Sequence, residues 1–245
     1  MPATEITAVR RIDRHEAPSL ADTEYRRLAT LAGALSPDEW AAPTECPGWT
    51  VRSVLAHVAG AMEGTSLRQG ARQRRLAARR SAASGRPFLD EMNESQIEER
   101  SGRSSEELVR ELRSRTAPAV RARRRVPAVL RRAPIPGSGD GLTLGDLLDV
   151  VLTRDVWMHR IDVCRAVGRP PHLTPDHDGR LVADVVREWA DRHAQPFTLH
   201  LGGPAGGTFV SGAGGPDITL DAAEFCRTLS GRVPGQGLLA NAVVF

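Results

Sequence analysis

The stretch "LTRDVWMHRIDV", residues 152–163, lies in a longer pattern that predicts an amphipathic helix. We place Val151 at zero on a helical wheel with about 100° per residue. Asp155 then falls at about 40°, His159 at about 80° and Asp162 at about 20°, on the face that carries the leucines. A buried carboxylate without a partner is costly, so something must satisfy these polar groups.

Two explanations are open for this polar face. Asp155 and His159, one helical turn apart, could form a structural pair, which is common for buried polar groups. Alternatively, His57 on an earlier helix completes a set of two histidines and one carboxylate, which leaves coordination positions open on zinc or non-haem iron. Asp162 could then orient a ligand, or it could pair with Arg165 on its own helix.

Helical periodicity predicts four helices before residue 170. Thr50 is the expected N-cap of the second helix, and Ser104 with Glu107 has capping-box spacing at the start of the third. The fourth begins with Thr143 and stops near Gly168. The arginine-rich middle, residues 68–102, has weak periodicity, so a loose connection or frayed helix is expected there. Four helices with a long crossover favour an antiparallel four-helix bundle.

After residue 170 the pattern changes. A helix over residues 176–194 leads into "FTLHL", whose alternation predicts a strand. Short strands joined by glycine turns follow, then a helix capped by Asp221 with Glu224, and "GLLANAVVF" is expected to close the chain as a strand. The predicted fold class is α+β: a four-helix bundle over residues 1–170 and a small α+β domain over residues 171–245.

The composition of the 245 residues, 40% hydrophobic and 26% charged, is typical of a soluble globular protein. The sequence shows no apolar run long enough to span a bilayer and no signal segment. Three widely spaced cysteines do not suggest a disulfide framework, so we expect a cytoplasmic protein. All 33 basic residues are arginine, yet the net charge is only +3, which fits codon bias in a GC-rich genome better than nucleic-acid binding.

Two stretches carry a resemblance to a known family. "ECPGWTVRSVLAHVAG" (residues 45–60) and "RDVWMHRIDVCRAVGRP" (154–170) resemble the signature stretches of the mycothiol-dependent maleylpyruvate isomerase family, which belongs to the DinB-like metalloenzyme superfamily. The ending "DAAEFCRTLSGRVPGQGLLANAVVF" (221–245) is similar to that of the family's small C-terminal domain. The resemblance therefore implies a DinB-like bundle and covers both predicted domains.

The resemblance implies a divalent metal held by His57, Asp155 and His159, with zinc expected first and nickel or iron as alternatives. It also implies mycothiol, the low-molecular-weight thiol of actinobacteria, as thiol cosubstrate. An arginine of the C-terminal domain is expected to bind the anionic substrate or thiol. Arg232 is the best match and Arg227 the second, although Arg232 could equally serve as a cation at a helix C-terminus. The maleylpyruvate isomerases have glutamate at the position of Asp155, which puts maleylpyruvate as substrate in doubt.

The expected enzyme uses a metal-activated thiolate that adds to an electrophilic small molecule, as an S-transferase or a cis–trans isomerase. A metal-dependent hydrolase on the same site is one alternative. A non-catalytic regulator that binds nucleic acid through "RQRRLAARR" (72–80) and "RARRRVPAVLRR" (121–132) is another, but both runs lack interleaved aromatics. We therefore expect small-molecule partners, no membrane or nucleic acid, and a monomer or homodimer. Cys46, Trp49 and Trp157 are interpreted as structural residues.

Overall fold

The computed structural model describes residues 3–135 and 141–245, and the chain divides into two compact units. One unit is Arg14–Arg169 and the other is Pro170–Phe245 together with the N-terminal segment up to Asp13. The sequence pattern places that segment with the bundle. The structure differs because β1 (Thr4–Glu5) pairs with β3 (Gly207–Ser211) and so adds an edge strand to the C-terminal sheet.

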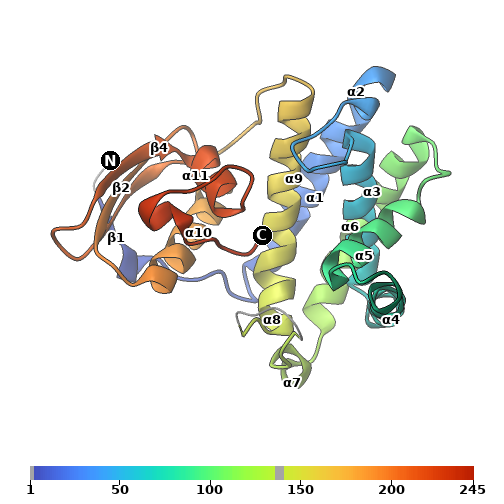
Figure 1. The fold of residues 1–245 in the computed structure, drawn as a ribbon, viewed down its shortest axis with the longest axis horizontal. Helices are drawn as coiled ribbons and strands as arrows, with labels where there is room; N and C mark the ends of the chain where they lie inside the picture. The colour runs from blue at the N-terminus through green and yellow to red at the C-terminus, as the bar shows by residue number, and fades with distance from the viewer. Residues whose placement is uncertain (1–2, 136–140) are drawn as a thin grey trace. The chain divides into compact units, whose positions relative to one another are not determined.

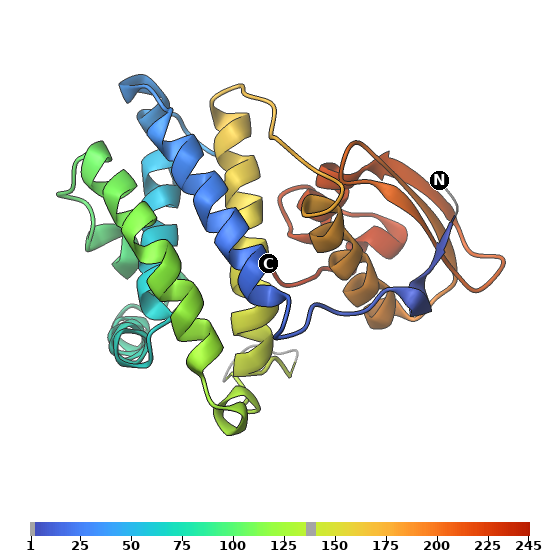
Figure 2. The same cartoon turned by 180° about the vertical axis from the view of Figure 1, so that it is seen from behind.

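Four long helices form the bundle of the first unit (Figures 1 and 2). They are α1 (Ala17–Gly33), α3 (Val51–Gly64), α6 (Ser105–Arg125) and α9 (Leu152–Ala166). Helix α1 packs on α6 and α9, and α3 packs on the same two helices. Their apolar faces meet in one buried core, which includes Leu28, Val54, Leu55, Leu108, Leu112 and Val156. The predicted four-helix arrangement and the α+β class of the chain are confirmed.

The predicted helix ends are confirmed where side chains cap them. The Thr50 side chain accepts a bond from the backbone N–H of Ser53, and Ser104 forms a capping box with Glu107. Thr143 caps the short helix α8 (Leu144–Asp146). A π-helical turn, labelled η2 (Leu147–Val151), separates α8 from α9, so the predicted fourth helix is interrupted before it carries its polar residues.

The expectation of a loose middle segment is wrong. Residues 68–102 contain α4 (Leu67–Ser84) and α5 (Phe88–Glu98), joined at Gly85, whose φ of 75° ends α4 in the left-handed conformation. Arginine–glutamate pairs link the two helices, among them Arg72–Glu99 at 2.7 Å. The buried face of α4 consists of small and polar residues, so hydrophobic periodicity alone could not reveal it. The short helix α2 (Pro37–Ala41) precedes α3.

The second unit is built on a four-stranded sheet with the order β1-β3-β2-β4. Strand β2 (Phe197–Gly202) runs antiparallel to β3 and parallel to β4 (Asp217–Asp221). Helices α10 (Asp178–His193) and α11 (Ala222–Leu229) complete the unit. The rings of Trp189, Phe197 and Phe225 meet in its core. The ring centroid of Trp189 lies 4.7 Å from that of Phe197 and 5.4 Å from that of Phe225.

The predicted closing strand is wrong. Residues Gly237–Ala240 form a 3₁₀ turn, η3, and the final residues do not join the sheet. Val243 instead donates its backbone N–H to the carbonyl of Leu229 at the end of α11. Gly237, with a φ of 56°, turns the chain there, so the apolar ending packs without a strand ladder. Within the described residues, no helix combines the length and the apolar character that a membrane span requires.

Candidate metal centre

The structure brings together the three residues that the sequence singles out. His57 comes from α3, while Asp155 and His159 lie one turn apart on α9. The Nε2 atom of His57 is 3.5 Å from Asp155 Oδ2, and the Nε2 atom of His159 is 3.3 Å from Asp155 Oδ1. One potential ligand atom from each of the three lies within 4.8 Å of the others. Both side chains of the histidines are buried.

A chain of amide hydrogen bonds fixes the tautomer of His57. Gln73 donates through Nε2 to the backbone carbonyl of Gly60, which can only accept. Its Oε1 therefore accepts from Gln96 Nε2, at 3.1 Å, and Gln96 in turn presents Oε1 to His57 Nδ1, at 2.9 Å. Nδ1 must then carry the hydrogen, so the Nε2 lone pair of neutral His57 is directed toward Asp155.

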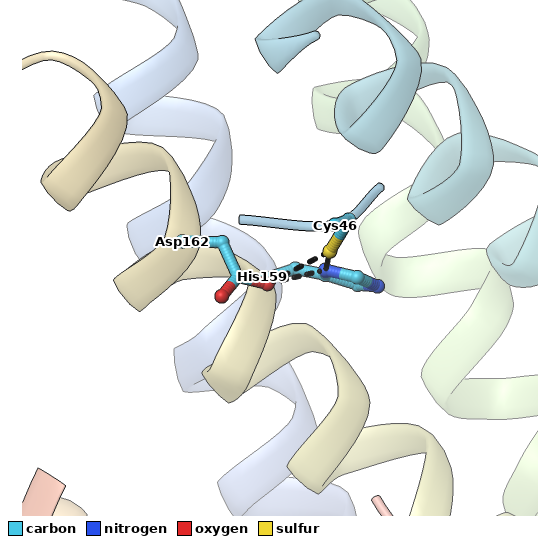
Figure 3. A group of neighbouring side chains, drawn as sticks. All are labelled: Cys46, His159 and Asp162. Atoms are coloured by element: carbon cyan, nitrogen blue, oxygen red, sulfur yellow. Dashed lines mark hydrogen bonds and ion pairs between the residues drawn. The ribbon is translucent and has the colours of Figure 1, made fainter. Parts of the chain in front are cut away.

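On the other side of the site, Asp162 fixes His159. Asp162 Oδ2 lies 2.9 Å from His159 Nδ1, so the carboxylate accepts the Nδ1 hydrogen and leaves the Nε2 lone pair of neutral His159 for Asp155. Cys46, in the segment before α3, donates its thiol to the same Oδ2 at 3.5 Å and lies 4.0 Å from His159 Nδ1 (Figure 3). Arg165 forms an ion pair with Glu45. Asp162 thus lies where it can orient the ring, which is one of the two roles that the sequence left open.

When both histidines are neutral, as metal binding requires, these bonds leave three electron-pair donors facing one another without a hydrogen between them. Asp155 Oδ2 is buried and has no hydrogen-bond partner in the described part of the chain. Such a set needs a cation, and two imidazole nitrogens with one carboxylate are suitable ligands for zinc, iron or nickel. The residues present therefore fit the divalent metal that the sequence resemblance implies.

The pKa shifts of Asp155 and His159 have the directions expected where a carboxylate and a positive charge stabilise each other. Burial raises the pKa of Asp155, but the adjacent His159 and His57 outweigh it and hold that pKa well below its usual range. Burial lowers the pKa of His159, yet Asp155, Asp162 and Cys46 together raise it well above its usual value. Without a metal, a proton on His159 therefore supplies the positive charge that Asp155 requires.

Trp49 forms a wall of this site. Its ring centroid lies 5.2 Å from that of His57 and 6.0 Å from that of His159. The indole Nε1 donates to Glu94 Oε1 on α5, at 3.3 Å. Trp157, by contrast, is fully buried. The packing role predicted for both tryptophans is consistent with these contacts, but Trp49 packs against the candidate ligands themselves.

The candidate arginines belong to the other compact unit. Arg227 is buried in α11 and forms an ion pair with Glu224 one turn earlier. Arg232 follows that helix, and its backbone N–H donates to the Arg227 carbonyl across Gly231. This position is compatible with a cation at the helix C-terminus. The ligand-binding role of Arg232, or of Arg227, stays a prediction.

Sequence reasoning missed the two glutamines that hold His57. Gln73 and Gln96 both lie in the segment expected to be loose. A weak signal was present, because Gly70, Gln73 and Ala77 recur at helical spacing and form the buried face of α4. Cys46 was interpreted as structural, and its contact with Asp162 could not be anticipated from residues 116 positions apart.

Comparisons with known proteins agree on one family. A family model described as "Mycothiol maleylpyruvate isomerase N-terminal domain" matches residues 21–164, more than half of the chain. The crystal structure of the mycothiol-dependent maleylpyruvate isomerase, and that of a mutant with one histidine replaced by alanine, each match with a TM-score of 0.57 and 16% identity. Each match covers 94% of this chain and 92% of the other, which establishes the shared fold. No curated protein matches. The chain therefore belongs to the family of proteins with a mycothiol maleylpyruvate isomerase N-terminal domain.

Proposed function

We propose that this chain is a metal- and thiol-dependent enzyme that adds mycothiol, or a similar small thiol, to an electrophilic small molecule. The observation that carries the proposal is the convergence of three lone-pair donors on a buried site where Asp155 Oδ2 has no hydrogen-bond partner among the described residues. Family membership supports the thiol, since the related solved structure is named as mycothiol-dependent.

His57, Asp155 and His159 would hold a divalent metal, with zinc as the first choice. When bound, the metal would supply Lewis acidity that lowers the pKa of a thiol in an open coordination position. The protein's own contribution is orientation. Gln96 and Asp162 accept the Nδ1 hydrogens of the two histidines, which keeps both Nε2 lone pairs directed at the same point.

The proposed reaction is addition of the thiolate to an electrophilic carbon. Protonation of the neighbouring carbon and release of the adduct complete an S-transfer. Alternatively, rotation about the carbon–carbon bond that addition has made single, followed by expulsion of the thiolate and return of the double bond, completes a cis–trans isomerisation. Arg232 is proposed to bind an anionic group of the substrate or thiol. Asp155 is one methylene shorter than the glutamate of the maleylpyruvate isomerases, so we leave the substrate as an electrophile of unspecified structure.

The structure lends no support to a nucleic-acid regulator. Within "RQRRLAARR", Arg72 and Arg80 pair with glutamates at the end of α5. Within "RARRRVPAVLRR", Arg123 and Arg131 are buried. Since none of the three cysteines forms a disulfide, we also propose that the enzyme works in the reducing cytoplasm.

The test is an activity assay on metal-loaded protein with mycothiol and a panel of electrophiles, among them maleylpyruvate. We expect consumption of the electrophile only when metal and thiol are both present, and no consumption by Asp155→Asn. Hydrolysis of panel compounds without any thiol would instead establish a water-activating hydrolase. Inactivity of a protein that binds about one metal per chain, across thiols and electrophiles, would contradict an enzyme of this class.

A further inference from the structure

A second polar cavity lies in the bundle unit, apart from the residues of the metal centre. Its volume is about 310 Å³, and its walls come from the start of α1, the end of α6, the short helix α7 (Ala128–Arg131) and the π turn η2. Helices α7 and α8 lie at one end of the bundle and α2 at the other (Figure 1). The basic run "RARRRVPAVLRR" supplies three of the lining arginines.

Arg123 is the unusual member of this lining. Its side chain is buried, with only 3% of the residue exposed. Its guanidinium donates to the carbonyl of Leu148, the hydroxyl of Tyr25 and the hydroxyl of Thr153. All three partners are neutral, so within residues 3–135 and 141–245 no carboxylate balances this buried charge. A buried charge that is hydrogen-bonded but not neutralised is costly to retain.

The rest of the lining adds positive charge. Arg131 pairs with Asp149, which is the single carboxylate among the described lining residues. Arg14 and Arg124 are exposed at the cavity and form no ion pair with another described residue. Four guanidinium groups therefore share one carboxylate. The first turn of α1 also lines the cavity, and the positive end of that helix dipole favours an anion.

The π turn adds an independent structural observation. Residues Leu147–Val151 depart from α-helical geometry, and this turn supplies both the Leu148 carbonyl for Arg123 and the Asp149 carboxylate for Arg131. Isolated π turns inside α-helices are rare and occur frequently at functional sites. Here the turn arranges acceptors around two buried arginines and leaves the cavity beside them.

We propose that this cavity binds a small dianion whose charge lies on oxygen atoms, such as a phosphate group or a dicarboxylate. The volume is at the lower end of the range for small-molecule sites, which excludes large ligands. Two negative charges would balance Arg123 and one of the exposed arginines, while Arg131 keeps Asp149. Arg14 and Arg124 supply long-range attraction and direct contacts, and Arg123 supplies the buried positive charge.

Titration calorimetry with inorganic phosphate and with succinate tests the proposal on the full-length protein at low ionic strength. We expect saturable binding of at least one of the two anions. The anion that binds more tightly shows whether the cavity prefers a phosphate group or a dicarboxylate. The double variant Arg14→Gln/Arg124→Gln should weaken binding at least 10-fold, because both side chains are exposed and their loss should not disturb the core. Arg75→Gln, which removes an exposed arginine of α4, is the matched control and should bind as the wild type does.

A variant that is expected to bind the anion more tightly separates the proposal from misfolding, because a misfolded protein would lose affinity. Asp149→Asn removes the competing carboxylate and frees Arg131, so the anion should bind more tightly than in the wild type, by 3-fold or more. Metal content is measured in parallel and should not change in any variant. Absence of saturable binding of both anions at millimolar concentration, or equal affinity in the wild type and the double variant, would overturn the proposal.

Discussion

Two polar clusters include residues of α3 that are only six positions apart, His57 and Glu63, and they differ in how their charges are satisfied. The first is the metal centre around His57. The second surrounds Glu63 and contains Glu63, Arg100, Arg103, Glu111 and Arg115. In the second cluster Glu63 pairs with Arg100 and Arg115 at 3.0 and 3.1 Å, and every carboxylate oxygen of Glu63 and Glu111 has an arginine partner.

The comparison shows what separates a structural polar cluster from a candidate site. Around Glu63 the charges of opposite sign already face each other, so the cluster connects α3, the turn that follows α5, and α6 without any ligand. Around His57, the hydrogen-bond partners of both histidines contact the Nδ1 atoms. The atoms that face one another, the two Nε2 nitrogens and the carboxylate oxygens of Asp155, are acceptors when the histidines are neutral. The Glu63 cluster stabilises the fold, whereas the metal centre is complete only with a cation.

The largest effect is expected from breaking the metal centre. His57→Ala and Asp155→Asn each remove one of three ligands, so metal content measured by mass spectrometry should fall from about one ion per chain to nearly none. His200→Ala, at a half-exposed position of β2 in the other unit, is the control and should retain the metal. A metal-free wild type after zinc, nickel and iron supplementation would leave Asp155 and His159 as a buried structural pair.

The next effect concerns the arginine–glutamate cluster. Glu111→Gln leaves Arg100, which is 2% exposed, with one charged partner instead of two, so we expect a loss of about 3 kcal/mol in the free energy of unfolding. Urea denaturation measures it. Metal content should stay at one per chain, because none of the affected residues contacts the three ligands.

The stability that Glu111 contributes should depend on pH, and the pKa shift of Glu111 gives the sign of this dependence. Burial raises the pKa of Glu111, but Arg100 and Arg115 outweigh it, and the net pKa is lowered. A carboxyl whose pKa is lower in the folded protein contributes stability above its unfolded pKa of about 4.3, and that contribution is lost as the pH falls through the folded value. The difference between wild type and Glu111→Gln should therefore be full at pH 7 and shrink below about pH 4. If the difference in the free energy of unfolding between the two proteins did not depend on pH, the negative charge of Glu111 would not be the source of its stabilising effect.

A smaller effect sharpens the comparison within the metal centre. Gln96→Leu removes the acceptor of the His57 Nδ1 hydrogen and frees the ring to change tautomer, so metal affinity should fall by about 10- to 100-fold. Competition with a chromophoric chelator measures the change. Gln69→Leu is the matched control, because Gln69 lies on α4, is half-exposed, and uses its side chain to accept a hydrogen bond from Arg72. Equal affinities in the two variants would show that the amide chain plays no part in ligand orientation.

The sequence predicted residues that act within one helix better than residues that act between elements. Asp155 and His159 were predicted to share a face because helical geometry fixes side chains four positions apart. Their meeting with His57 required the bundle, which four periodic helices indicated. Gln96 could not be found, since its buried position follows from the docking of α5 rather than from any apolar stripe. Strand β1 was missed for a similar reason, because its partner β3 lies about 200 residues away.

The glutamine chain also has a thermodynamic consequence. Gln73 and Gln96 reach α3 only while the hairpin of α4 and α5 is docked, and Gly60 permits this docking because a Cβ there would lie 2.5 Å from the Gln96 Cβ. If docking strengthens metal binding by some factor, metal binding must strengthen docking by the same factor. The hairpin and the ion are then reciprocal effectors, and local opening of the hairpin, observable by amide hydrogen exchange, becomes a measure of metal occupancy.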